Sequence, residues 1–94
     1  MWHVEGFDAS GDNAEVAAFL SERFLPYCRA RGFTVRAFAT EASLGPRAFW
    51  LATEIAGFGD IDQWAARAGD EGARLIGELL ARADRLQGGV VREL

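Results

Sequence analysis

His3 is the only histidine in the sequence, and it is the first candidate for chemistry. An imidazole changes charge close to neutral pH, so it can accept a proton from a substrate bound beside it. Two carboxylates could assist: Glu5, on the same face of an expected strand, and Glu54, on a strand that could lie across from it. We take His3 and Glu54 as candidate catalytic residues. The alternative is an inert, partly exposed histidine near the N-terminus.

Three further residues could form a ligand-binding surface. Arg36, Phe38 and Trp50 lie on one face of two expected strands, because side chains alternate between the faces of a sheet. Such a face could hold a planar apolar ligand, with Arg36 pairing a carboxylate or phenolate. The competing interpretation, which we favour, is that these residues pack against a partner and that Arg36 pairs with Glu54 or Glu41 at the rim.

The remaining chemical side chains suit structural roles better. Trp64, on an expected helix, is either a core residue or lines a cavity between that helix and the sheet. Cys28 lies on the apolar stripe of another helix, where a thiol behaves as a small hydrophobic group. One histidine cannot build a zinc or haem-iron site with several imidazoles, although it could supply a single haem ligand. We expect no metal site and no cofactor.

Composition narrows the class of protein. The 94 residues fit one domain, half of them are hydrophobic, and the net charge is −4. An acidic chain repels phosphate backbones, so we expect no nucleic-acid partner. A single cysteine excludes an internal disulfide, and no apolar run reaches the roughly 20 residues of a membrane span. The N-terminus lacks the basic start and apolar core of a signal peptide, so we expect a cytoplasmic protein without a membrane partner.

The first half of the chain predicts a strand and a helix. Residues 2–7 alternate in polarity, with His3 and Glu5 on the face that also carries Phe7. Residues 13–31 repeat apolar positions at helical spacing, with Asp12 as the expected N-cap and Glu15 completing a capping box. Pro26 interrupts this helix and predicts a kink or a restart.

The second half predicts a hairpin, a bent helix and a last strand. Residues 33–40 and 47–56 form the hairpin, joined by a turn at 44–47. Asp60 is the expected cap of a helix that bends at Gly69-Asp70 and runs to about Arg85. Gly88-Gly89 is expected to end this segment before a short strand over residues 90–94.

The order strand, helix, strand, strand, helix, strand is the βαββαβ pattern of the ferredoxin-like fold. We therefore predict an α+β protein with a four-stranded antiparallel sheet. Right-handed connections place both helices on one face of this sheet. In the usual arrangement of this fold the first and third strands are central, which suits the long apolar stretch 47–56.

The uncovered sheet face predicts a homodimer. It would expose Phe38, Trp50, Ala48 and Ala52, an apolar patch of roughly 300–500 Å², near the size at which such surfaces mark interactions. Two copies related by a two-fold axis can cover each other's patch. The alternative is a monomer with a ligand groove on that face.

The chain also resembles a known superfamily. Leu25-Pro26-Tyr27 before Gly32-Phe33, the hairpin residues 44–50 and the broken second helix are similar to the dimeric α/β barrel superfamily, which includes antibiotic-biosynthesis monooxygenase-like and NIPSNAP-like proteins. The resemblance implies a dimer, and some members are cofactor-independent monooxygenases or haem-degrading enzymes. Haem-binding members carry a histidine on a helix, which this chain lacks.

Two hypotheses for function follow. The first is a small protein that binds an apolar or aromatic molecule between sheet and helices and acts as a monooxygenase-like enzyme, with His3, Arg36, Trp50 and Glu54 in the site. The second is a non-catalytic dimeric module with a structural or regulatory role. An open pocket that reaches His3 favours the first, and a cavity filled by Phe and Trp side chains favours the second.

Overall fold

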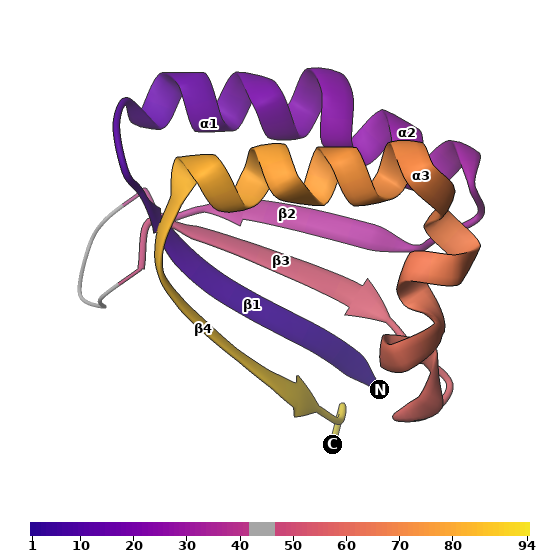
Figure 1. Ribbon diagram of the computed structural model, residues 1–94. Helices are drawn as coiled ribbons and strands as arrows, with labels where there is room; N and C mark the ends of the chain where they lie inside the picture. Colours follow the sequence, from indigo (N-terminus) through magenta and orange to yellow (C-terminus); the bar gives the residue numbers. More distant parts are fainter. Residues whose placement is uncertain (42–46) are drawn as a thin grey trace.

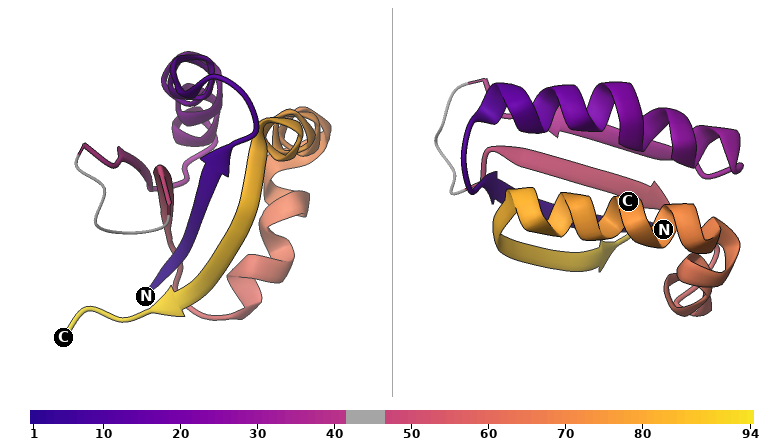
Figure 2. Two further views of the ribbon diagram at one scale, coloured as in Figure 1. Left: turned by 90° about the vertical axis from the view of Figure 1, so that its left-hand side faces the viewer. Right: turned by 45° about the horizontal axis from the view of Figure 1, so that its top comes forward.

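The computed structural model describes residues 1–41 and 47–94 and has the ferredoxin-like fold. A four-stranded antiparallel sheet is covered on one face by two helical segments, and no helix of the described residues covers its other face (Figures 1 and 2). The elements in chain order are β1 (Trp2–Ala9), α1 (Asn13–Phe19), η1 (Leu20–Phe24), α2 (Leu25–Ala30), β2 (Val35–Ala39), β3 (Phe49–Glu54), α3 (Gly59–Arg82) and β4 (Ala83–Val91).

The sheet order β2-β3-β1-β4 confirms that the first and third strands are central. The hairpin strands are shorter than expected, and of the predicted turn at 44–47 residues 44–46 lie outside the described residues. Residues paired across the strands share a face. The helix-covered face therefore carries Phe7 opposite Phe49, and these two buried rings stack at 5.7 Å between centroids.

Pro26 shapes the first helical segment. The predicted Asp12 cap is confirmed, since the Asp12 side chain accepts a hydrogen bond from the backbone N–H of Ala14. The expected kink takes the form of a π-helical turn, η1, in which the N–H of Leu25 donates to the carbonyl of Leu20. This turn ends one α-helix and starts another, so Pro26 stands in the first turn of α2, where a missing N–H costs little.

Helix α3 bends at Gly69, as predicted. Gly69 has φ 76° and ψ −172°, a region of the Ramachandran map that essentially only glycine occupies. Two side chains hold the bend from outside: the Tyr27 hydroxyl donates to the Ala68 carbonyl, and Arg31 donates to the Arg67 carbonyl at 3.0 Å. The bend directs the first half of α3 along the end of the sheet (Figure 1).

Two predictions about the second half were wrong. Asp60 is not the cap of α3, because the helix begins at Gly59, and the Asp60 carboxylate instead accepts from the Ala56 N–H at 2.8 Å. The last strand begins at Ala83, not at residue 90, so Gly88 and Gly89 lie inside β4. Gly88 is opposite Glu5, and a Cβ there would lie 3.3 Å from the Val4 carbonyl oxygen. A glycine pair that looked like a break therefore serves a close approach of two strands.

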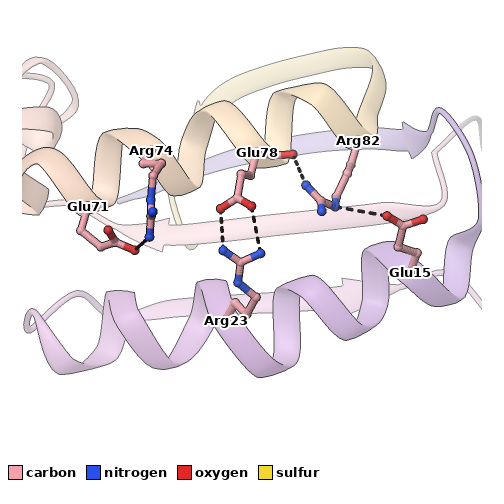
Figure 3. A network of polar contacts seen from close by, with 6 residues as sticks. All are labelled: Glu15, Arg23, Glu71, Arg74, Glu78 and Arg82. Atoms are coloured by element: carbon pink, nitrogen blue, oxygen red, sulfur yellow. Dashed lines mark hydrogen bonds and ion pairs between the residues drawn. The ribbon is translucent and has the colours of Figure 1, made fainter.

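A row of ion pairs joins the two helical segments on their outer side (Figure 3). Arg23 of η1 donates two hydrogen bonds to the Glu78 carboxylate of α3, at 2.9 and 2.6 Å. Glu15 lies 3.6 Å from Arg82 of α3, so the expected capping partner of Asp12 pairs with the other helix. Beneath this row, the core contains Phe7, Val16, Phe19, Leu20, Phe24, Leu25, Cys28, Phe33, Val35, Phe49, Leu51, Ala68, Leu75 and Leu79.

Candidate functional site

A cavity of about 340 Å³ lies between the helix-covered face of the sheet and helix α3. Its walls are mainly apolar side chains from β2, β3, η1, α2 and α3. They are Phe24, Cys28, Val35, Leu51, Ile55, Ile61, Trp64, Ala65, Ala73, Ile76 and Leu79. A concave, mostly apolar space with a few polar groups is typical of small-molecule sites.

The polar groups of the cavity come from three elements. His3 and Glu5 lie on the same face of β1, Thr53 is directly opposite His3 on β3, and Asp60 comes from the first turn of α3. The Nε2 atom of His3 is 3.5 Å from a carboxylate oxygen of Glu5. Both side chains are partly buried, at 28% and 38% exposure. A histidine beside a carboxylate can accept a proton, and the carboxylate stabilises the imidazolium that forms.

Trp64 forms part of the wall contributed by α3. Its ring stacks on Phe33 at 5.5 Å between centroids, and the Arg67 guanidinium lies 4.5 Å from the Phe33 ring. Trp64 precedes the bend at Gly69, so the bend sets the position of this part of the wall. Trp64 therefore combines the two positions considered for it, because it packs against the core and also lines the cavity.

The other four predicted site residues lie on the opposite face of the sheet, which we call the open face. Arg36 and Phe38 border a depression of about 310 Å³, where the Arg36 guanidinium lies 5.4 Å from the Trp2 ring centroid. Trp50 covers Gly6, where an added Cβ would come within 2.6 Å of the indole ring. Glu54 pairs with Trp2.

The sheet therefore separates the residues that sequence reasoning grouped together. His3 and Trp64 share the cavity, whereas Arg36, Phe38, Trp50 and Glu54 lie on the open face. The expected position of Glu54 across from His3 was wrong, because Thr53 is the residue opposite His3. The register places Glu54 one residue further along β3, on the other side of the sheet.

Cys28 lines the cavity but is not a nucleophile there. Its side chain is buried, and burial raises the pKa of the thiol from 9.0 to about 11, against a smaller opposing effect of Arg29. The thiol therefore stays protonated near neutral pH, and the thiolate is the reactive form. This agrees with a packing role for Cys28.

Sequence reasoning missed several residues of the cavity as site residues. Glu5 was seen beside His3 but was not chosen, and Asp60 was expected only as a helix cap. Thr53, Ile61 and Ile76 looked like ordinary strand or helix residues. The two-residue spacing of His3 and Glu5 was the one usable signal, since it places both on one face of a strand.

Residues 1–41 and 47–94 contain no group of three or more His, Cys, Asp or Glu side chains that could hold a metal ion. Within these same ranges, no helix has the length and apolar character needed to cross a membrane.

No protein-family model and no curated protein matches the sequence. Solved structures do match the fold. A NIPSNAP family protein from Agrobacterium tumefaciens has a TM-score of 0.70 and 16% identity, and the alignment covers 100% of this chain and 94% of that one. A variant of SnoaB, a cofactor-independent oxygenase from Streptomyces nogalater, has a TM-score of 0.65 and 15% identity, over 99% and 93% of the chains.

HapK from Hahella chejuensis matches with a TM-score of 0.63 and 10% identity, over 98% of this chain and 93% of that one. All three likenesses extend over nearly the whole of both chains. They confirm the expected ferredoxin-like fold, which the NIPSNAP family protein and SnoaB share.

Proposed function

We propose that this protein binds a small, mainly apolar or aromatic molecule in the cavity between the sheet and α3. The observation that supports this most is the combination of about 340 Å³ of mostly apolar space with the one histidine of the chain in its wall. Apolar walls bind the body of such a ligand, and a few fixed polar groups orient it. His3, Glu5 and Trp64 are the side chains to which we assign these roles.

The chemistry that suits this arrangement is proton removal from the ligand. When an acidic O–H or C–H of the ligand lies near the His3 ring, the imidazole accepts its proton, and Glu5, 3.5 Å from Nε2, stabilises the resulting charge. An electron-rich anion held among apolar walls is kept from water and can react with dioxygen. The structural likeness to SnoaB, a cofactor-independent oxygenase, supports this monooxygenase-like form of the proposal.

The open face supports the second part of the proposal, a homodimer. Phe38 is 54% exposed and Val91 is 49% exposed, and the register puts Trp2, Val4, Trp50 and Ala52 on the same face. In the proposed dimer, a second copy seated on the open face buries these apolar side chains.

The binding proposal can be tested with two neighbouring alanines of α3. Both are exposed, but Ala65 lines the cavity and Ala66 does not. Ala65→Leu adds three carbon atoms to the cavity wall, so we expect it to weaken the binding of 2-naphthol at least fivefold in calorimetric titration. Ala66→Leu should leave the dissociation constant unchanged. Equal effects of the two substitutions, or no binding to the unaltered protein, would contradict the proposal.

The chemical step needs its own measurement. Oxygen uptake is followed with polycyclic phenols that bind, first with the unaltered protein and then with His3→Asn. We expect uptake to fall at least 100-fold while binding changes little, because Asn keeps a polar group but cannot take up the proton. Binding without any oxygen uptake would instead support the non-catalytic module.

A further inference from the structure

The polar side chains that the described residues contribute to the cavity include two negatively charged groups and no arginine. Two of the four, Glu5 and Asp60, are carboxylates, and the other two are His3 and Thr53. Besides its histidine, the chain has ten basic residues, and all ten are arginines. None of the arginines in the described ranges lines the cavity. The site therefore offers carboxylate oxygens to a ligand, and no guanidinium.

Three arginines that could be thought to reach a ligand contact other groups or lie on the other face of the sheet. Arg31 donates to the Arg67 carbonyl, and Arg67 lies over the Phe33 ring. Arg36, which sequence reasoning offered as a partner for a carboxylate or phenolate, lies on the open face. Of the ion pairs formed within the described residues, the one that involves Glu5 is with His3.

Gly88 of β4 provides the space that Glu5 and His3 occupy. An added Cβ at this position would lie 3.3 Å from Cγ of Glu5 and 4.0 Å from Nε2 of His3. Since Gly88 lies directly opposite Glu5, the missing side chain leaves room for the carboxylate beside the imidazole. Three neighbouring positions on two strands, His3, Glu5 and Gly88, thus accommodate the carboxylate of Glu5 in the cavity wall.

These observations predict how the cavity discriminates between charges. A carboxylate that enters a partly buried site next to Glu5 and Asp60 meets like charges, which disfavour its binding. A protonated amine meets opposite charges, and the ring of Trp64 attracts a cation that lies over its face. A neutral hydroxyl should bind with an affinity between those of the carboxylate and the protonated amine.

We infer that the cavity selects ligands with an apolar body and a positively charged or hydrogen-bond-donating end group, preferring an amine to an alcohol and an alcohol to a carboxylate. This inference rests on the proposed binding function and specifies the class of ligand for the same site. It differs from the alternative weighed from the sequence, a carboxylate or phenolate paired with Arg36, which lies on the open face.

Three ligands with one body test the inference: 2-naphthalenemethylamine, 2-naphthalenemethanol and 2-naphthoic acid, titrated calorimetrically at neutral pH. We expect the amine to bind at least tenfold more tightly than the acid, with the alcohol between them. Glu5→Gln should reduce the ratio of amine to acid affinity at least threefold and change alcohol binding less than twofold. Asp60→Asn, which keeps an acceptor for the Ala56 N–H, should act in the same direction.

The control is Glu22→Gln, which removes an exposed carboxylate that does not line the cavity and should leave the ratio unchanged. Equal binding of amine and acid, or a ratio that neither Glu5→Gln nor Asp60→Asn lowers, would overturn the inference. If the alcohol still binds and Ala65→Leu weakens it, the proposed binding site stands although the charge preference fails. If none of the three ligands binds, both are refuted.

Discussion

Phe38→Asp tests the homodimer across the open face. Phe38 is 54% exposed, and its partner across the strands is Trp50, at the middle of that face. Of the 150–250 Å² that a Phe side chain can bury, about 110 Å² remains available for a partner, or about 220 Å² for both copies. At about 25 cal/mol per Å² this area gives an upper limit of about 5 kcal/mol for the contribution of the two Phe38 side chains to the free energy of dimerisation.

Only part of this area needs to be covered for a large effect. If half of it is buried, the loss is about 3 kcal/mol, which corresponds to about a 100-fold weaker dimer. We therefore expect Phe38→Asp to raise the dimer dissociation constant at least 100-fold.

The assay is sedimentation velocity at protein concentrations from about 0.1 to 100 μM, a range wide enough to resolve a 100-fold change in affinity. The control is Phe58→Asp, because Phe58 is also exposed, at 66%, but precedes α3 and does not belong to the open face. The reasoning is refuted if the unaltered protein is monomeric throughout this range. It is also refuted if Phe38→Asp and Phe58→Asp have the same effect.

Three further predictions concern stability and reactivity. Gly69→Ala should destabilise the fold by about 1–3 kcal/mol in chemical unfolding because of its positive φ, whereas Gly77→Ala, with open space around it in a regular helix, should stabilise it by about 0.5–1 kcal/mol. The hydrogen bond from Arg23 lowers the pKa of Glu78 below 4.5, so this ion pair stabilises the fold above that pH and is lost as the pH falls. The stability lost by Glu78→Gln should therefore shrink below pH 4.5. A difference in stability that stays constant with pH would contradict this. With a pKa of about 11, Cys28 should react with a disulfide reagent at pH 8 at least about 100-fold more slowly in the folded than in the unfolded protein, and equal rates would show that it is accessible.

Much of the fold follows from local patterns. The alternation in residues 2–7 correctly placed His3, Glu5 and Phe7 on one face, and the predicted Asp12 cap and the Gly69 bend are both present. Each depends on residues close together in the chain, whose conformational preferences are strong.

Other features depend on distant partners and could not be predicted in this way. Gly88 looks like a strand breaker until Glu5 is known to lie opposite it. The π-helical turn before Pro26 is one of several ways to accommodate a proline, and local sequence does not select among them.

The candidate site shows the same limit. Alternation alone shows that Trp50 and Glu54 share one face of β3, but not that Glu54 lies beside Trp2 while Thr53 lies beside His3. That depends on the register between β1 and β3, which are far apart in sequence. The contribution of Asp60 to the cavity depends in turn on the position of the first half of α3, before the bend at Gly69.

The three indole N–H groups of the chain allow the most direct test of the proposed binding site. Trp64 lies at the cavity, whereas Trp2 and Trp50 lie on the open face, so each face has its own signal in a ¹H–¹⁵N correlation spectrum. On titration with 2-naphthol, we expect the Trp64 indole and the Thr53 amide to shift with one common dissociation constant, while the indoles of Trp2 and Trp50 stay in place. Shifts confined to Trp2 and Trp50 would place the ligand on the open face and contradict the account.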